Sequence, residues 1–255
     1  MKVTQLDWFL WVAYFLAEVV LLSILVYRSR WKEFPVFTTL IGVDSAVNVV
    51  LFISRVYAPV GWYSRIYYAY DFPYFSLQLG VAWEIASIVM RPTGTWIRDA
   101  RKQFIFWSAV SIFTAAALSW IFTRPAGRPL ERFEAWSDLF VDLVFCELLI
   151  AMLLIAKRLG LGFRNHVFAL VLGWSLAALG SMPIDILRGY YGTHFYLDMF
   201  TNIAQFSFFI SLLYWSVQFW VDEPARRPIS PELSAYIQNL HRRIENNLDT
   251  MDAQR

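Results

Sequence analysis

The residues best suited to chemistry are carboxylates that lie inside long apolar segments of the sequence. Ionisable groups are costly inside a bilayer, so they usually face the protein interior or a water-filled cavity. Residues three or four apart on a helix lie one above the other, which groups many of these side chains on shared faces. Four such polar faces are formed by Asp44, Asn48 and Arg55, by Asp138 and Asp142, by Ser181, Asp185 and Arg188, and by His194, Asp198, Asn202 and Gln205.

Most of these faces fall in the outer half of their segments, in the orientation argued below. We expect them to line an outward-facing crevice that binds a small molecule or an ion. The ligand-binding residues predicted for it are Asp71, Asp142, Asp185, Asp198, Asn202, His194, Arg55 and Arg188, with Asp138 also in its lining. A structural alternative uses the same residues. In it, Asp185 and Asp198 pair with the two arginines near the membrane interface, and Asp138 caps its helix.

A second set of carboxyls lies deeper in the apolar segments. Glu18 and Glu147 fall near the bilayer midplane, and Glu84 lies towards the inner side. Carboxyls that are dry at this depth are expected to be protonated and hydrogen-bonded, because an isolated charge is costly away from water. A proton or cation path across the bilayer would use Glu18, Asp44, Glu84 and Glu147.

Aromatic side chains are concentrated around Asp71. They are Trp62, Tyr63, Tyr67, Tyr68, Tyr70, Phe72, Tyr74 and Phe75. Rings around a carboxylate suit a cationic ligand, although rings are also common at the membrane interface. Pro73 is expected to bend the start of the third helix or to mark its first turn.

Known enzyme and cofactor motifs are absent from the sequence. It has no HExxH, no GxSxG, and no glycine-rich phosphate loop followed by lysine. Two of its three histidines, His166 and His241, fall at cytoplasmic positions, so a histidine-rich zinc site is not available, and no haem motif is present. The single cysteine, Cys146, excludes an intrachain disulfide. We expect no cofactor, and the sequence favours a protein without enzymatic activity over an intramembrane enzyme, which stays an alternative; carboxylates near His194 could hold a hard divalent cation.

Composition and hydropathy identify the elements that must position these residues. Hydrophobic residues make up 58% of the 255 residues and charged residues only 16%, unlike an average soluble domain. A bilayer-spanning helix needs about 20 mostly apolar residues. Seven segments meet this requirement, at about 6–27, 34–57, 66–90, 103–123, 136–156, 166–187 and 195–220. The predicted fold class is therefore all-α, a seven-transmembrane-helix bundle.

The basic residues predict the orientation of this bundle. Over alternate connections, twelve lysines and arginines fall on one side and seven on the other. The side with more basic residues is cytoplasmic by the positive-inside rule. This places the N-terminus outside and the C-terminus in the cytoplasm, as in a multi-pass protein of the cell membrane. The basic residues lie in short clusters between apolar segments, which does not suggest nucleic-acid binding.

The chain turns polar after the seventh segment, which predicts a membrane domain at 1–222 and a cytoplasmic tail at 223–255. Ser230, Pro231 and Glu232 are typical of a helix start. A single apolar stripe follows, formed by Leu233, Ile237, Leu240, Ile244, Leu248 and Met251. We expect a short amphipathic helix at 231–251. It would pack against another copy of the tail as a coiled coil, against the loops or against a cytoplasmic partner, unless it rests on the membrane surface.

The layout of seven helices with an external N-terminus resembles that of microbial rhodopsins, in which a lysine of the seventh helix binds retinal one turn after an aspartate. Here Asp198 is followed four residues later by Asn202, and Asp71 resembles the other counter-ion position. The lysines of this chain are Lys2, Lys32, Lys102 and Lys157, and all lie outside the predicted spans. A retinal Schiff base is therefore excluded, and the resemblance is one of layout.

Three functions are consistent with these observations. In the first, the crevice senses or binds a small molecule or ion, and the tail signals the change. In the second, the intramembrane carboxylates form a proton or cation channel or transporter, which needs a continuous polar path. In the third, the protein is a structural subunit of a membrane complex. An interior that closes on Leu, Phe and Trp below Asn202 and Glu147 would favour the first over the second.

Overall fold

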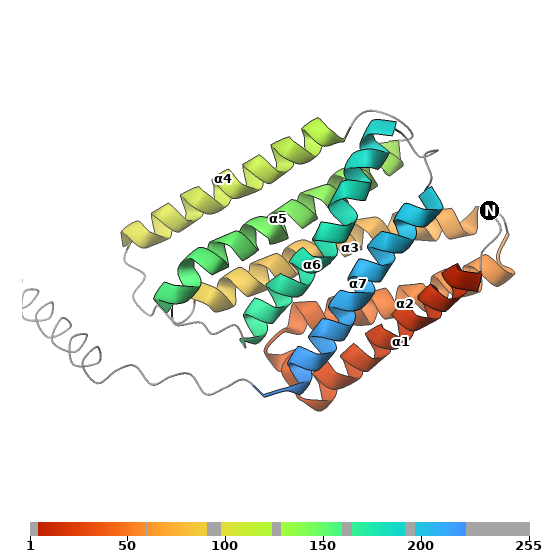
Figure 1. The fold of residues 1–255 in the computed structure, drawn as a ribbon, viewed down its shortest axis with the longest axis horizontal. Helices are drawn as coiled ribbons and strands as arrows, with labels where there is room; N and C mark the ends of the chain where they lie inside the picture. The colour runs from red at the N-terminus through yellow and green to blue at the C-terminus, as the bar shows by residue number, and fades with distance from the viewer. Residues whose placement is uncertain are drawn as a thin grey trace, which may run out of the picture. The chain divides into compact units, whose positions relative to one another are not determined.

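The computed structural model describes residues 5–59, 61–90, 98–123, 129–159, 165–191 and 197–222. These residues form seven α-helices and one short 3-10 helix (Figure 1). In chain order they are α1 (Gln5–Tyr27), η1 (Arg30–Lys32), α2 (Pro35–Tyr57), α3 (Trp62–Met90), α4 (Arg98–Phe122), α5 (Pro129–Leu159), α6 (His166–Tyr191) and α7 (Leu197–Trp220). Contacts divide the chain into two units, Met1–Glu223 and Pro224–Arg255. The second unit, with the tail helix expected at 231–251, lies outside the described residues.

The all-helical prediction is confirmed, and the helices follow the apolar segments closely. Three helices begin earlier than expected: α3 at Trp62 rather than residue 66, α4 at Arg98 rather than residue 103, and α5 at Pro129 rather than residue 136. Their first turns carry polar residues that lower the hydropathy without preventing a helix, and a proline suits the first position of α5. Two expectations were therefore wrong. Pro73 lies inside α3, well beyond its first turn, and Asp138 lies nine residues into α5, so it cannot cap that helix.

The described helices have the character of membrane-associated segments. Three stretches are long and apolar enough to cross a membrane: Trp8–Tyr27, Pro35–Tyr57 and His166–Leu187. Phe113 is 75% exposed and Trp83 is 71% exposed, whereas the side chain of Glu18 is 0% exposed. Large exposed apolar surfaces of this kind mark contact with a membrane or another protein.

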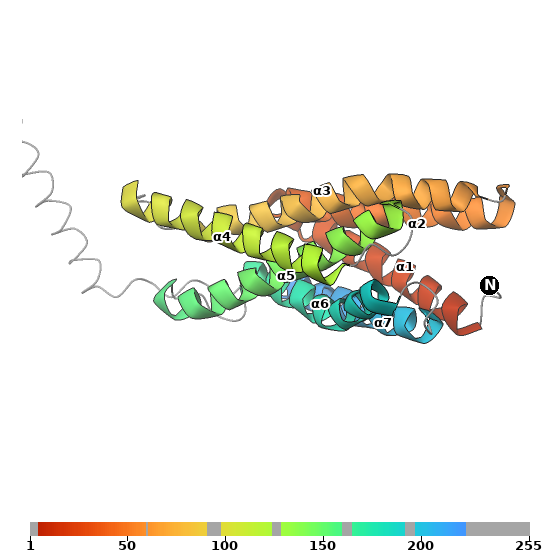
Figure 2. The ribbon, with the colours of Figure 1, turned by 90° about the horizontal axis from the view of Figure 1, so that it is seen from above.

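Helices that follow one another in the chain run in opposite directions, so α1, α3, α5 and α7 start at one end of the bundle and α2, α4 and α6 at the other (Figure 1). Six of them form a closed ring in the order α1, α2, α3, α5, α6 and α7, with α7 packed against α1. Helix α4 packs on the outside of this ring, mainly against α5. Figure 2 shows α3 on one side of the bundle and α6 and α7 on the other. We call the end at which α1 and α7 begin the first end, and the end at which α2 begins and α7 finishes the second end.

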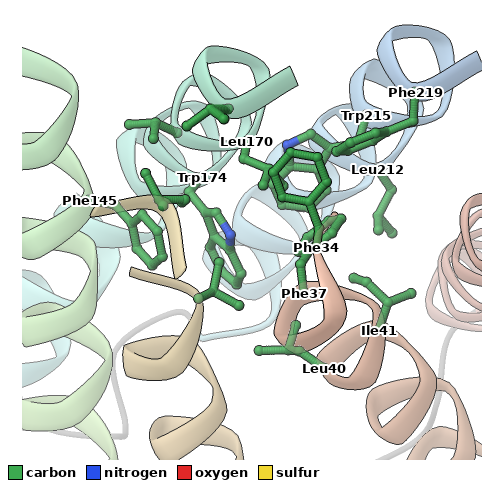
Figure 3. Packing of buried hydrophobic residues seen from close by; sticks show 14 of the residues in the cluster. Phe34, Phe37, Leu40, Ile41, Phe145, Leu170, Trp174, Leu212, Trp215 and Phe219 are labelled. Atoms are coloured by element: carbon green, nitrogen blue, oxygen red, sulfur yellow. The ribbon is translucent and has the colours of Figure 1, made fainter. Parts of the chain in front are cut away.

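An aromatic core fills the ring towards the second end (Figure 3). It consists of Phe34, Phe37, Leu40, Ile41, Phe145, Leu170, Trp174, Leu212, Trp215 and Phe219. The ring of Trp215 lies 5.1 Å from that of Phe37 and 5.5 Å from that of Trp174. Its indole nitrogen donates a hydrogen bond to the carbonyl oxygen of Ala169 at 3.1 Å, which satisfies the buried polar group. The second half of the bundle is thus closed by packed rings.

Helices α6 and α7 approach each other closely at the small residues of α6. A Cβ atom at Gly173 would meet the ring of Trp215, and one at Gly180 would meet the side chain of Ser207. The hydroxyl of Ser211 donates a hydrogen bond to the carbonyl oxygen of Gly173 at 2.8 Å. Small residues allow helices to pack this closely in an apolar environment. The contact holds α6 and α7 together over about two turns.

Candidate functional site

Five carboxylates from three helices converge towards the first end of the bundle. We call them the α3–α5–α6 carboxylates: Asp71 of α3, Glu134, Asp138 and Asp142 of α5, and Asp185 of α6. Asp138 is close enough to the other four to interact with each of them electrostatically. Asp71 interacts in the same way with Glu134, and Asp142 with Asp185. Like charges held this close cannot all remain ionised without a bound cation or shared protons.

Hydroxyl groups organise this cluster. The Tyr67 hydroxyl donates a hydrogen bond to Glu134 Oε1 at 2.7 Å, which links α3 to α5. The Ser181 hydroxyl donates to Asp142 Oδ2, which links α6 to α5. Asp185 is 7% exposed, so this part of the cluster is well shielded. The helices are therefore held together around the carboxylates by neutral donors.

Three of the predicted crevice residues, Asp71, Asp142 and Asp185, are brought near one another. Glu134 was missed because we placed the start of the fifth segment at residue 136. Its spacing of four residues from Asp138, and of eight from Asp142, would have put all three on one face. The extended helix thus supplies a complete acidic stripe rather than a pair.

The other predicted crevice residues have different surroundings. Asn202 is partly buried on α7. Arg188 and Asp198 belong to α6 and α7, but their side chains lie outside the description, as does the whole of His194. The described arginines at the first end lie over aromatic rings: Arg55 over Tyr63 at 5.6 Å, Arg65 over Trp62 at 5.9 Å and Arg132 over Trp120 at 4.5 Å. Arg55 is exposed and does not share the inward direction of Asp44 on the same helix.

A separate polar cluster joins α1, α2 and α3. Asn48 Nδ2 donates a hydrogen bond to Glu18 Oε2 at 3.0 Å. The two oxygens of Asp44 accept hydrogen bonds from the hydroxyls of Tyr14, at 3.1 Å, and Tyr70, at 3.0 Å. Glu18 is 0% exposed and Asp44 is 8% exposed. Sequence reasoning found both carboxyls, but it did not place them together or find their tyrosine partners.

Glu84 has a structural role at the start of α2. Its carboxylate accepts hydrogen bonds from the backbone N–H groups of Val36, at 2.9 Å, and Phe37, at 3.1 Å. The first N–H groups of a helix have no partner within the helix, and Pro35 at the first position lacks an N–H altogether. A negative charge is also favourable at this end of the helix dipole. Glu84 thus caps α2 from α3.

Glu147 lies between α4 and α5. The hydroxyl of Ser111 on α4 donates a hydrogen bond to Glu147 Oε2. Ser111 belongs to α4, which packs outside the ring. Glu147 therefore helps to attach α4 to α5. Among the described contacts it makes no hydrogen bond with Glu18 or Glu84.

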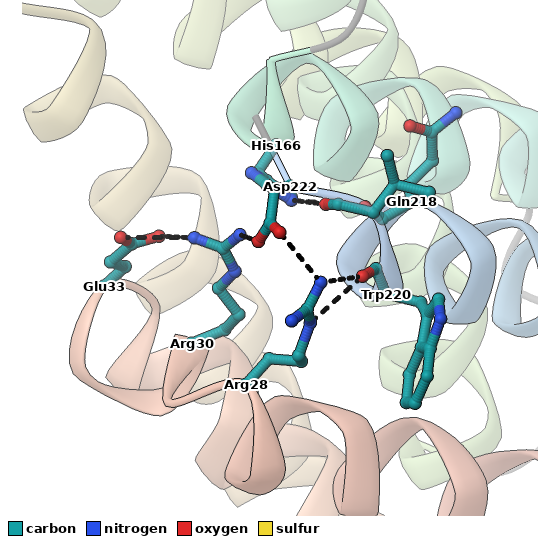
Figure 4. A network of polar contacts seen from close by, with 8 residues as sticks. Arg28, Arg30, Glu33, His166, Gln218, Trp220 and Asp222 are labelled. Atoms are coloured by element: carbon teal, nitrogen blue, oxygen red, sulfur yellow. Dashed lines mark hydrogen bonds and ion pairs between the residues drawn. The ribbon is translucent and has the colours of Figure 1, made fainter. Parts of the chain in front are cut away.

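A cluster of polar contacts at the second end fixes the end of α7 (Figure 4). Arg28 donates two hydrogen bonds to the carbonyl oxygen of Trp220, at 3.0 and 2.6 Å, and forms an ion pair with Asp222 at 3.1 Å. Arg30 forms ion pairs with Asp222 and with Glu33, both at 3.3 Å. We call these five residues the α7 clasp. Positive groups near the last carbonyls complement the helix dipole.

His166, the first residue of α6, completes the attachment of α7. Its Nε2 lies 3.1 Å from the carbonyl oxygen of Gln218 and 3.2 Å from that of Val221. The imidazole stacks on Phe219 at 5.2 Å. The last turn of α7 is therefore held by residues from the α1–α2 connection and from the start of α6. Sequence reasoning predicted only that Arg28, Arg30 and His166 lie on the cytoplasmic side.

Comparison of the chain with protein-family models, with curated proteins and with solved structures finds no match.

Proposed function

We propose that this protein is a seven-span receptor of the cell membrane that binds a cationic small molecule or ion at the α3–α5–α6 carboxylates. In this proposal the first end of the bundle faces outwards. The second end and the tail at 223–255 face the cytoplasm, where the tail signals the change. The observation that carries the proposal is the convergence of five carboxylates from three helices.

The membrane part of the proposal rests on the surface and on the charges. Each of the seven α-helices formed by the described residues has at least 23 residues, which is long enough to cross a hydrocarbon core of about 30 Å. The described surface carries many large apolar side chains. The excess of basic residues on one side supports the orientation.

The cluster favours a cation as the ligand. A positive charge would relieve the repulsion among the carboxylates, and the rings of Tyr67 and its neighbours on α3 would offer a further surface for a cation. Binding would draw α3, α5 and α6 together, since each contributes at least one carboxylate. A neutral or anionic ligand would gain nothing from this arrangement.

Binding is better supported than conduction. A channel or transporter needs a polar path across the bilayer, whereas the aromatic core occupies the second half of the ring. Glu84, which the relay hypothesis uses as its inner step, is engaged in capping α2. Glu147 is engaged with α4. The described contacts therefore favour a site that is closed on its inner side.

Helix α6 offers a route from the site to the tail. Near its C-terminal end it carries Asp185 and Ser181, and at its first residue it carries His166, which contacts the last turn of α7. A displacement of α6 on ligand binding would therefore act on the residues immediately before the tail. The physical element proposed to change is the contact between α6 and the end of α7.

The orientation can be tested with reporters. A reporter fused after Arg227 should be cytoplasmic, and one inserted in the 124–132 connection should be external, because basic residues are retained on the cytoplasmic side. Paired reporters that are active only in the cytoplasm or only outside it would measure this. A reporter after Arg227 that proves external would overturn the proposed orientation.

The site can be tested by thermal unfolding of the purified protein with Mg²⁺, Ca²⁺ and spermidine as probes. At about 100 times its Kd, a bound probe adds about 2.7 kcal/mol of stability. We expect a rise in Tm of about 5–10 °C for the probe that binds. Asp142→Asn, which removes one charge at nearly constant shape, should reduce this rise by at least half.

Glu33→Gln is the matched control, because Glu33 is an exposed carboxylate at the second end. It should leave the response to each probe unchanged. If Asp142→Asn responds as the wild type does, the cluster is not the binding site. In that case the carboxylates only help the helices to pack together, and the protein is better explained as a structural subunit of a membrane complex.

A further inference from the structure

The polar cluster that joins α1, α2 and α3 contains two carboxyls with few donors. The side chain of Glu18 lies beside that of Asp44, and Ser45 lies beside Glu18. All three residues are at least nine-tenths buried, with exposures of 0% for Glu18, 8% for Asp44 and 6% for Ser45. Two negative charges buried side by side are unstable unless a positive charge accompanies them.

Within the described part of the chain, two buried oxygens of this cluster have no well-oriented hydrogen-bond partner. Tyr14 and Tyr70 donate to the two oxygens of Asp44, and Asn48 donates to Glu18 Oε2. Glu18 Oε1 and Ser45 Oγ are buried, and neither has a well-oriented hydrogen-bond partner among the described residues, although the side chains of Ser45 and Asp44 lie within hydrogen-bonding reach of Glu18. Buried polar atoms in folded proteins nearly always have a partner, so two such oxygens side by side require an explanation.

We propose that Glu18, Asp44 and Ser45 bind one small monovalent cation, of the size of Na⁺. Such a cation takes Glu18 Oε1 and Ser45 Oγ as ligands and neutralises one of the two carboxylates. The competing explanation is a proton shared by Glu18 and Asp44, with the Ser45 hydroxyl donating to Glu18, and the salt comparison below distinguishes the two.

This site is separate from the α3–α5–α6 carboxylates. It has its own donors from α3, since Tyr70 donates to Asp44 whereas Tyr67 donates to Glu134. The remaining negative charge is stabilised by the donors from Tyr14, Tyr70 and Asn48. The bound cation links α1 to α2, and through Tyr70 the cluster also holds α3.

The proposal is tested on the purified full-length chain by thermal unfolding in NaCl and in choline chloride at equal ionic strength. Choline is too large for the site, so only Na⁺ should raise Tm. Glu18→Gln should abolish the difference in Tm between the two salts. Ser45→Ala, which removes one ligand without changing the charge, should raise the Na⁺ concentration needed for half of the effect by at least tenfold.

Two controls separate this site from other acidic residues. Glu84→Gln removes a buried carboxylate that caps α2 and should retain the full difference between NaCl and choline chloride. Asp142→Asn should retain it as well, whatever happens to binding at the α3–α5–α6 carboxylates. Equal melting temperatures of the wild type in the two salts would overturn the proposal and leave a proton shared by the carboxyl pair. It would also be overturned by a Glu18→Gln variant that keeps the sodium response.

Discussion

Glu84→Ala should lower the free energy of unfolding by about 2–4 kcal/mol, since each buried N–H group left without a partner costs about 1–3 kcal/mol. The change removes the only acceptor that the described contacts give to the N–H groups of Val36 and Phe37. In an apolar environment water cannot replace it. Thermal or denaturant unfolding in detergent, followed by tryptophan fluorescence, would measure the loss.

Two further variants show whether capping is the cause. Glu84→Gln keeps one acceptor oxygen, so it should cost roughly half as much as the alanine change. Glu33→Ala removes an exposed carboxylate close to the same helix start and should cost no more than about 0.5 kcal/mol. Equal losses for Glu84→Ala and Glu33→Ala would show that the cap contributes nothing.

Gly173→Ala should destabilise the protein by about 1–3 kcal/mol, the usual cost of forcing an extra methyl group into a packed core. The added Cβ would meet the ring of Trp215, which is 0% exposed and packed against Phe37 and Trp174. The ring cannot move aside without losing its hydrogen bond to Ala169. Unfolding experiments and the fluorescence spectrum of the buried indole would both report the change.

Gly42→Ala is the matched control on α2. A Cβ atom there would have its nearest neighbour, Leu22 Cδ1, at an ordinary contact distance of 3.8 Å. Because alanine favours a helix over glycine by about 1 kcal/mol, this change should be neutral or stabilising. If both glycine variants are destabilised alike, close packing of α6 on α7 is not the reason that position 173 is glycine.

The sequence predicts the helices of this protein well because long apolar segments have few alternatives to a helix in an apolar environment. The starts of α3 and α5 were missed because polar residues in their first turns lower the hydropathy there, although these residues are still helical. The boundary of an apolar segment is therefore a poor guide to polar residues such as Glu134.

The site could be predicted only in part, because helical spacing gives the direction of a side chain on its own helix but not the helix that it meets. The structure brings Asp71, Asp142 and Asp185 together around Asp138, because α3, α5 and α6 are neighbours. Arg55 was grouped with Asp44 by spacing, yet it lies over Tyr63. Glu84 was assigned to the proton or cation path because helical spacing could not reveal its hydrogen-bond partners on α2, which lie 47 and 48 residues away in the sequence.

The α7 clasp has a consequence for biosynthesis. Arg28 binds Trp220, a residue that lies 192 positions further along the chain. At a synthesis rate of about 5–20 residues per second, α1 waits roughly 10–40 s for the helix that completes the ring. During that time the faces of α1 and α2 that α7 will cover are open to lipid or to an insertion chaperone. Closure of the bundle is therefore a late event, which a ribosome stalled before Asp222 would prevent.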